Sequence, residues 1–188
     1  MKTLLYSCLL LSLAVPFSAL PARINRTVNS GWLFQKGEVD AAGGVKNPDE
    51  WTRVNLPHTW NIADVQDEPR GYYRGPGWYA KVLRIPAEWK EKKVYLHFEG
   101  ANQEATVFLN GKELGHHIGG YTAFRFDLSP HLTFGDENLL TVRVTNKLKD
   151  SIPPLSGDFT IYGGIYRNVR LIVTDPVHFD MENDASEG

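Results

Sequence analysis

Hydrophobic and polar residues alternate with a period of two along most of the chain, a pattern that predicts half-buried β-strands. The alternation is clearest in three segments: 94–99, 140–145 and 168–173. One face of the first segment carries Val94, Leu96 and Phe98. No window shows a sustained helical period, and residues 87–93 fit only one short helical turn. The chain is therefore predicted to consist almost entirely of β-structure.

Turn signals separate the predicted strands at short intervals. Residues 105–109 form an apolar segment, predicted to be buried on both faces, and they run directly into Asn110-Gly111. This dipeptide is the strongest short hairpin signal, because both central positions of such a turn need positive φ. Many short strands with turns every eight to twelve residues or so are typical of an antiparallel sandwich or barrel.

The first residues have the features of a secretory signal peptide. Lys2 precedes an apolar run from Leu4 to Val15, and small residues follow it. We expect residues 1–22 to be this signal, with cleavage after Ala19 or Ala22, and the protein to be secreted or periplasmic. The run is too short to span a bilayer comfortably. A lipoprotein anchor at Cys8 is disfavoured, because a cut there would leave almost no hydrophobic segment.

Composition narrows the class of protein. Cys8 is the only cysteine, so the mature chain would have no disulfide and must be held by its hydrophobic core. The remaining chain of about 165 residues fits one domain of ordinary size. A net charge of −2 without a basic stripe argues against nucleic acid as a partner. Aromatic residues make up 12% of the chain, which suits a β-rich core and carbohydrate stacking equally well.

No self-contained active site is visible in the sequence. His116 and His117 are adjacent, so on a strand they point to opposite faces and cannot share one metal ion. No Gly-x-Ser-x-Gly motif, phosphate loop or dinucleotide fingerprint is present, and no cofactor is predicted. Glu99 and Glu104 flank the turn at 100–103 and are expected to be solvated hairpin ends.

Two loops are candidates for function. The polar segment 61–70 has no periodicity and is long, which indicates a surface or functional loop. The segment 156–167 places Asp158 among aromatic residues, followed by Gly163-Gly164. It suits either a ligand-facing rim or a packed loop in which Asp158 caps a turn. The residues alone favour turn capping, because turn aspartates are far more common.

The whole set of motifs resembles a known family. The motifs are Gly77-Trp78-Tyr79, Ile85-Pro86 with Trp89, 94–100, 105–111, 115–124, 138–144 and 162–167. In this order and spacing they resemble the N-terminal sugar-binding domain of glycoside hydrolase family 2, the family of β-galactosidases, β-glucuronidases and β-mannosidases. The likeness extends from Trp32 to Val173.

The resemblance implies a fold and a domain organisation. The fold would be a galactose-binding-domain-like jelly roll, an antiparallel all-β sandwich. Family members continue into an immunoglobulin-like domain and a (β/α)₈ catalytic barrel. Accordingly, we expect the sandwich at 23–176 and the start of a linker to a missing immunoglobulin-like domain at 177–188.

The resemblance also implies substrate-binding residues. The acid before the Gly-Gly-Ile-Tyr-Arg motif, here Asp158, would reach the sugar pocket of the barrel. Arg74 would line the same pocket, at a position where some members carry Asn. Tyr73 and His58 are added because they are near in sequence. Arg74 could instead be a surface ion-pair partner, and His58 a hydrogen-bonded loop residue.

The expected function is that of one part of an enzyme. A retaining glycosidase needs two carboxyl groups about 5–5.5 Å apart, and in the family both belong to the barrel. We therefore expect a non-catalytic, carbohydrate-binding domain of a secreted family 2 glycosidase of β-galactosidase type, which binds a β-galactoside-like sugar. Two alternatives remain open: a stand-alone carbohydrate-binding module, and a structural sandwich that docks on neighbouring domains.

Overall fold

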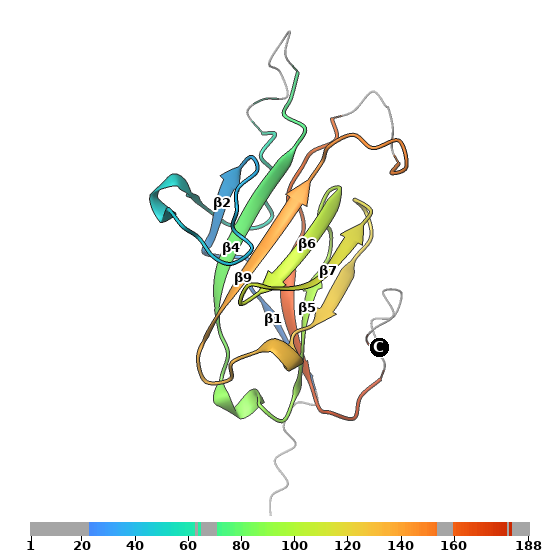
Figure 1. Cartoon of the computed structure of the whole chain (residues 1–188). Coiled ribbons are helices and arrows are strands. Elements are labelled where there is room, and N and C mark those ends of the chain that lie inside the picture. The colour runs from blue at the N-terminus through green and yellow to red at the C-terminus, as the bar shows by residue number, and fades with distance from the viewer. Residues whose placement is uncertain (1–22, 63, 65–70, 154–159, 180, 182–188) are drawn as a thin grey trace, which may run out of the picture.

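The computed structural model describes residues 23–62, 64, 71–153, 160–179 and 181, which form a two-layered β-sandwich (Figure 1). One sheet has four strands, in the order β1 (Arg23–Thr27), β10 (Val169–Thr174), β5 (Lys93–Phe98) and β8 (Phe124–Asp127). The other has six, in the order β3 (Thr52–Val54), β2 (Trp32–Lys36), β4 (Pro76–Arg84), β9 (Glu137–Thr145), β6 (Glu104–Leu109) and β7 (Lys112–Ile118). Every strand pair is antiparallel. The prediction of an antiparallel all-β sandwich is confirmed.

The remaining regular elements are three short 3₁₀ turns: η1 (Pro48–Glu50), η2 (Ala87–Trp89) and η3 (Ser129–His131). The single helical turn expected within 87–93 is η2. Strand β1 was not among the predicted strands. Its five residues include a single large apolar side chain, that of Ile24, so they show no alternation, and all of them are at least partly exposed.

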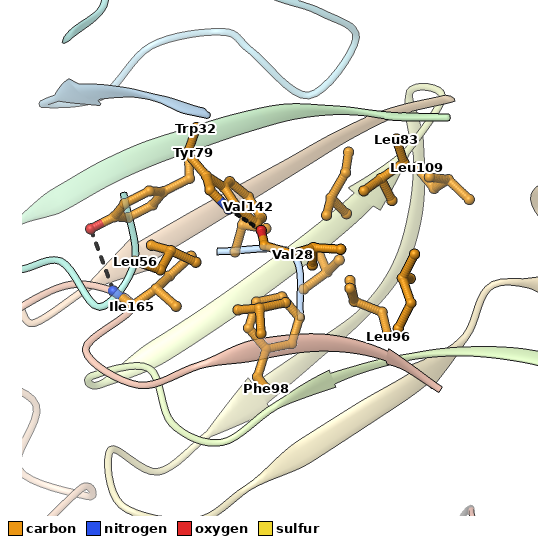
Figure 2. Close-up of a cluster of buried hydrophobic side chains, with 14 of the residues drawn as sticks. Val28, Trp32, Leu56, Tyr79, Leu83, Leu96, Phe98, Leu109, Val142 and Ile165 are labelled. Carbon is orange, nitrogen blue, oxygen red and sulfur yellow. Dashed lines mark hydrogen bonds between the residues drawn. The ribbon is translucent and has the colours of Figure 1, made fainter. Parts of the chain in front are cut away.

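The main core lies between the sheets and is built from the predicted inward faces (Figure 2). Val94, Leu96 and Phe98 of β5 are fully buried, as the alternation predicted, but Tyr95 and His97 on the opposite face are also buried, so this strand is not half-buried. Two aromatic residues of the core, Trp32 and Tyr79, have internal hydrogen-bond partners for their polar atoms. Trp32 Nε1 donates to the Val28 carbonyl at 2.7 Å, and the Ile165 amide donates to the Tyr79 hydroxyl at 3.4 Å. Burial of apolar area at about 25 cal/mol per Å² is the main stabilising contribution.

The Asn110-Gly111 turn joins β6 and β7 as predicted. Asn110 has φ 51° and Gly111 has φ 81°, conformations that asparagine and glycine tolerate best. The Asn110 side chain adds three hydrogen bonds: its Nδ2 donates to Asn138 Oδ1 at 2.9 Å and to the His131 carbonyl at 3.3 Å, and its Oδ1 accepts from the Leu139 amide at 2.9 Å. The turn is thereby tied to the neighbouring strand β9.

The expectation that Glu104 is a solvated hairpin end was wrong. Glu104 is only 4% exposed, because β6 lies between β9 and β7 and both neighbours cover it. Its carboxylate accepts from Lys149 Nζ at 2.7 Å and lies 3.4 Å from His116 Nε2. Glu99 is also partly covered and pairs with Arg170 at 2.5 Å. These acids stabilise the sandwich rather than stand free in solvent.

The connections that matter for function gather at one end of the sandwich, the upper end in Figure 1. We call this the loop end; it comprises residues 56–62, 71–75, 100–103, 119–122, 146–153 and 160–166. Backbone hydrogen bonds link these segments to one another: His58 to Ile165, Gly119 to Gln103, Asn146 to Gly75 and Asn102 to Gly164. Segments far apart in sequence therefore form one continuous surface.

Candidate functional site

A groove of about 830 Å³ opens at the loop end. Its described lining residues are Thr59, Asn102, Tyr121, Pro153, Thr160, Tyr162 and Tyr166. We call it the tyrosine groove. A concave site of this size, mostly apolar with a few hydroxyl and amide groups, is the usual form of a small-molecule site.

The tyrosine rings give the groove its chemistry. Tyr121 is 59% exposed and Tyr162 is 43% exposed, values far above those of the core aromatics. Tyr166 is half-buried, and burial raises the pKa of its hydroxyl. An exposed phenol combines a flat apolar face with a polar tip. Such rings can pack against the C–H face of a sugar or against another protein surface.

The rings stand on a rigid support. The Tyr166 hydroxyl donates to the Gly120 carbonyl at 2.5 Å, and Asn102 Nδ2 donates to the Tyr162 carbonyl at 2.6 Å. Asn102 and Gly164 also exchange backbone hydrogen bonds at 3.0 and 3.2 Å. These contacts fix the floor of the groove before any ligand arrives, which lowers the entropic cost of binding.

Gly163 packs where no side chain fits. A Cβ at this position would overlap the indole of Trp60, which is buried. The neighbouring Gly164 has φ 127°, a conformation that favours glycine. The Gly-Gly pair therefore serves the close packing of this turn into the sandwich.

Two buried asparagines, Asn61 and Asn146, hold the loops of the site together. Asn61 Oδ1 accepts from the Gly163 amide at 2.7 Å, and its Nδ2 donates to the Tyr73 carbonyl at 2.9 Å. Asn146 Oδ1 accepts from the Gly75 amide at 2.9 Å, and its Nδ2 donates to the Ile161 carbonyl at 3.0 Å. Neither asparagine was predicted as a site residue, because loop asparagines usually indicate local turns.

His58 lies beneath the loop end in a structural contact. Its Nδ1 is 2.8 Å from the Tyr79 hydroxyl, and its ring lies 4.7 Å from that of Phe34. Burial lowers the pKa of His58, so its imidazole is neutral at pH 7. This environment matches the alternative of a hydrogen-bonded loop residue.

Tyr73 also points into the sandwich. Its hydroxyl donates to the Pro76 carbonyl at 2.9 Å, and its ring meets Trp60 edge-on at 6.4 Å. Burial raises the pKa of the Tyr73 hydroxyl, and the nearby Glu38 carboxylate raises it further. Sugar contact by Tyr73 or His58 remains a prediction, and neither residue is among the described lining of the tyrosine groove.

Arg74 has an unusual set of contacts. Its Nε donates to the Asn146 carbonyl at 3.0 Å. Its Nη2 is buried and has no hydrogen-bond partner among the described residues, and no ion pair to a described acid is present. The alternative of a surface ion pair therefore gains no support from this part of the chain. Asp158 lies outside the described residues, so its predicted sugar contact also remains a prediction.

Large aliphatic side chains are also exposed at the loop end or directly beside it. Ile62 is 74% exposed, Ile118 is 59% exposed and Leu148 is 48% exposed. We call these three residues the aliphatic rim. Large aliphatic side chains gathered at one end of a domain are typical of an interaction surface.

The described residues lack two further features. They contain no group of three or more His, Cys, Asp or Glu side chains that could hold a metal ion. Nor do they contain a helix that is long and apolar enough to cross a membrane.

Fold and site together define a class of protein, the β-sandwich domains with a candidate binding groove at the loop end. Within this class, residues 22–176 match the family described as "Glycosyl hydrolases family 2, sugar binding domain". The chain belongs to this family, as its motifs predicted.

Several relatives are enzymes with assigned names. A β-glucuronidase of Bacteroides fragilis is 46% identical over 136 residues, which are 72% of this chain and 20% of that enzyme. A β-galactosidase of Thermoanaerobacter pseudethanolicus is 39% identical over 154 residues, which are 80% of this chain and 21% of that enzyme. The chain thus spans about a fifth of the length of these curated relatives.

Solved structures show the same relationship. The crystal structure of a Bacteroides uniformis β-glucuronidase matches with a TM-score of 0.80 and 43% identity, over 88% of this chain and 20% of that one. The predicted restriction to the β-galactosidase type is therefore narrower than the findings support, because relatives include glucuronidases as well as galactosidases.

Proposed function

We propose that this chain is the non-catalytic carbohydrate-binding domain of a secreted family 2 glycosidase and forms one wall of its sugar pocket. The observation that carries the proposal is the loop end, where the tyrosine groove opens and where the side chains of the aliphatic rim are exposed at the same end or directly beside it. Secretion is proposed from the signal-peptide pattern of residues 1–22.

The aliphatic rim supports docking onto further domains of the same enzyme. Ile62, Ile118 and Leu148 expose apolar surface that a partner domain would remove from water. The part of each named relative that matches this chain is only about a fifth of that relative's length, so such enzymes contain ample further structure. We propose the immunoglobulin-like and barrel domains of the family as these partners.

The groove and the nearby arginine support contact with the sugar. Tyr121 and Tyr162 offer flat faces for a pyranose ring, and Arg74 Nη2 is a donor that lacks a described partner. Asp158 would add an acceptor for sugar hydroxyls. Because the family's two catalytic carboxylates belong to the barrel, this domain would bind and orient the substrate without cleaving it.

The sugar would be a β-galactoside or a β-glucuronide. The names of the relatives support both, and a guanidinium such as that of Arg74 could bind a hydroxyl or a carboxylate. The full-length enzyme can be assayed with aryl β-galactosides and with aryl β-glucuronides. The ratio of the two kcat/KM values would show which sugar is preferred.

Kinetics of the full-length enzyme test the proposal. We expect Tyr162→Ala to raise KM by about tenfold through loss of stacking, and Tyr162→Phe to retain most of the affinity. Phe179→Ala is the matched control, because Phe179 is 84% exposed and lies outside the loop end. This chain alone should show no turnover. Turnover by the chain alone, or a Tyr162→Ala enzyme with unchanged kinetics, would contradict the proposal.

A stand-alone carbohydrate-binding module is the second candidate. It is supported by the tyrosine groove, which is already formed within this chain. Calorimetry with galactosides, glucuronides, and plant and host glycans separates the two candidates. A saturable signal from the isolated chain favours the module, whereas a flat trace across the panel removes it.

A further inference from the structure

A second cleft, of about 500 Å³, lies where the chain crosses from the four-stranded to the six-stranded sheet. Core side chains such as Leu83 and Leu171 form its floor. Its walls carry Arg26, Lys81 and Arg84. We call it the cationic cleft.

Two open strand edges border the cationic cleft. Strand β1, with Arg26, is the outer strand of its sheet. Strand β2 pairs with β4 only at residues 77–80, so residues 81–84 pair with β9 alone. The cleft therefore lies between two strand edges that have no further strand partner among the described residues, and its walls carry cationic side chains.

The charges of the cleft are only partly balanced. Arg84 pairs with Glu137, with its Nη2 2.8 Å from a carboxylate oxygen. Lys81 Nζ donates to the neutral carbonyl of Ser30 at 2.6 Å, and Arg26 forms no ion pair with a described residue. Two cations thus face one recess without an acid of their own.

Lysines on open edges often serve only to prevent edge-to-edge pairing. Such lysines extend into solvent, whereas Lys81 is half-buried and turned onto Ser30. Burial lowers the pKa of Lys81, and the positive charge of Arg26 lowers it further. A bound anion would relieve this repulsion, because an opposite charge within about 4–6 Å favours the charged form of lysine.

We propose that the cationic cleft binds an oxyanion of an acidic glycan, either a uronate carboxylate or a sulfate ester. Arg26 would hold the oxyanion as a planar fork, and Lys81 would act as a point charge. The site is separate from the tyrosine groove, because the two share no described lining residue.

The surface beside the cleft supports a ligand longer than one sugar. Arg26 and Arg84 also line an adjoining hollow, where Asp136 and Glu137 are the acidic residues. A glycan chain could therefore place its anionic group at Arg26 and Lys81 and continue along the hollow. The acids of the hollow would accept hydrogen bonds from neutral hydroxyl groups.

Titration of the ¹⁵N-labelled chain by NMR at constant ionic strength tests the proposal. The probes are methyl β-glucuronide, a sulfated methyl glucoside, sodium sulfate, and neutral methyl β-glucoside. We expect saturable shifts of the amides of residues 26–30 and 81–84 with an acidic sugar and none there with the neutral one. The two acidic sugars distinguish a carboxylate from a sulfate ester.

The double variant Arg26→Gln/Lys81→Gln should weaken this binding by about tenfold or more. Lys90→Gln/Lys112→Gln is the matched control, since it removes the same charge from exposed positions elsewhere. If both double variants weaken binding equally, binding depends on the net charge of the chain and not on the cationic cleft, and the proposal is overturned. Shifts with sodium sulfate and with neither acidic sugar would indicate an adventitious ion only and would also overturn the proposal. The absence of a saturable shift with either acidic sugar would overturn it as well. Shifts confined to the amides of 119–122 and 160–166 would report the tyrosine groove, so the two sites are read separately.

Discussion

Asn61 and Gly163 are 102 positions apart in the chain, and the side-chain oxygen of Asn61 accepts a hydrogen bond from the Gly163 amide at 2.7 Å. Asn146 makes a parallel link to the Ile161 carbonyl at 3.0 Å. Both asparagines are fully buried, so these hydrogen bonds are shielded from water. They fix the segment that carries Tyr162 and so connect the core to the rim of the tyrosine groove.

We expect Asn146→Ala to lower the free energy of unfolding by about 3 kcal/mol. The change leaves the Gly75 amide and the Ile161 carbonyl without their side-chain partner in a buried place. Urea denaturation measures the loss. Asn47→Ala is the control, because the exposed Asn47 side chain bonds only to Glu50, and its loss should be about 0.5 kcal/mol or less. Equal losses for the two variants would contradict the structural role of Asn146.

We expect Gly163→Ala to destabilise the chain by about 1–3 kcal/mol. The added methyl group would overlap the ring of Trp60, which has little room to move within the core. Gly43→Ala is the matched control, because no atom lies within 4 Å of the position of its added Cβ. The melting temperatures of the Gly163→Ala and Gly43→Ala proteins, measured by thermal unfolding, give the comparison. A Gly163→Ala protein as stable as the control would mean that the turn does not pack as described.

His58 should make the stability depend on pH between neutral and mildly acidic conditions. Burial lowers its pKa below the ordinary value of about 6.5, so the unfolded state binds the proton more readily. The stabilising contribution of neutral His58 is therefore present above about pH 6.5 and is lost as the pH falls toward the folded pKa. Urea denaturation at several pH values gives the free energy of unfolding as a function of pH. The slope of this dependence should be smaller for His58→Asn than for the wild type. An unchanged slope would contradict the assignment.

The strands were predictable because their signals are local. Alternation over a few residues places Val94, Leu96 and Phe98 on one face wherever the strand pairs. The Asn110-Gly111 turn is equally local, since its positive φ angles depend on the two residues themselves. The resemblance to family 2 added the sandwich topology, which local patterns alone do not determine.

The missed features depend on partners that are distant in sequence. Glu104 resembles a solvated turn residue until Lys149, 45 positions later, pairs with it under the cover of two strands. Asn61 and Asn146 likewise resemble ordinary loop residues, because the groups that they bind come from other loops. The tyrosine groove combines Tyr121 with Tyr162 and Tyr166, which are distant from it in sequence and meet it at the loop end of the folded sandwich.

The predicted role of Asp158 can be tested in the full-length enzyme. We expect Asp158→Asn to lower kcat/KM on its aryl glycoside by about tenfold to a hundredfold, since a hydrogen bond between a carboxylate and a sugar hydroxyl contributes about 1.5–3 kcal/mol. The melting temperature should not change, because the substitution keeps the size of the side chain. Asp150→Asn removes the same charge from an exposed position of the loop end and is the control. Wild-type kinetics of Asp158→Asn on both galactosides and glucuronides would leave Asp158 with the turn-capping role that its local sequence first favoured.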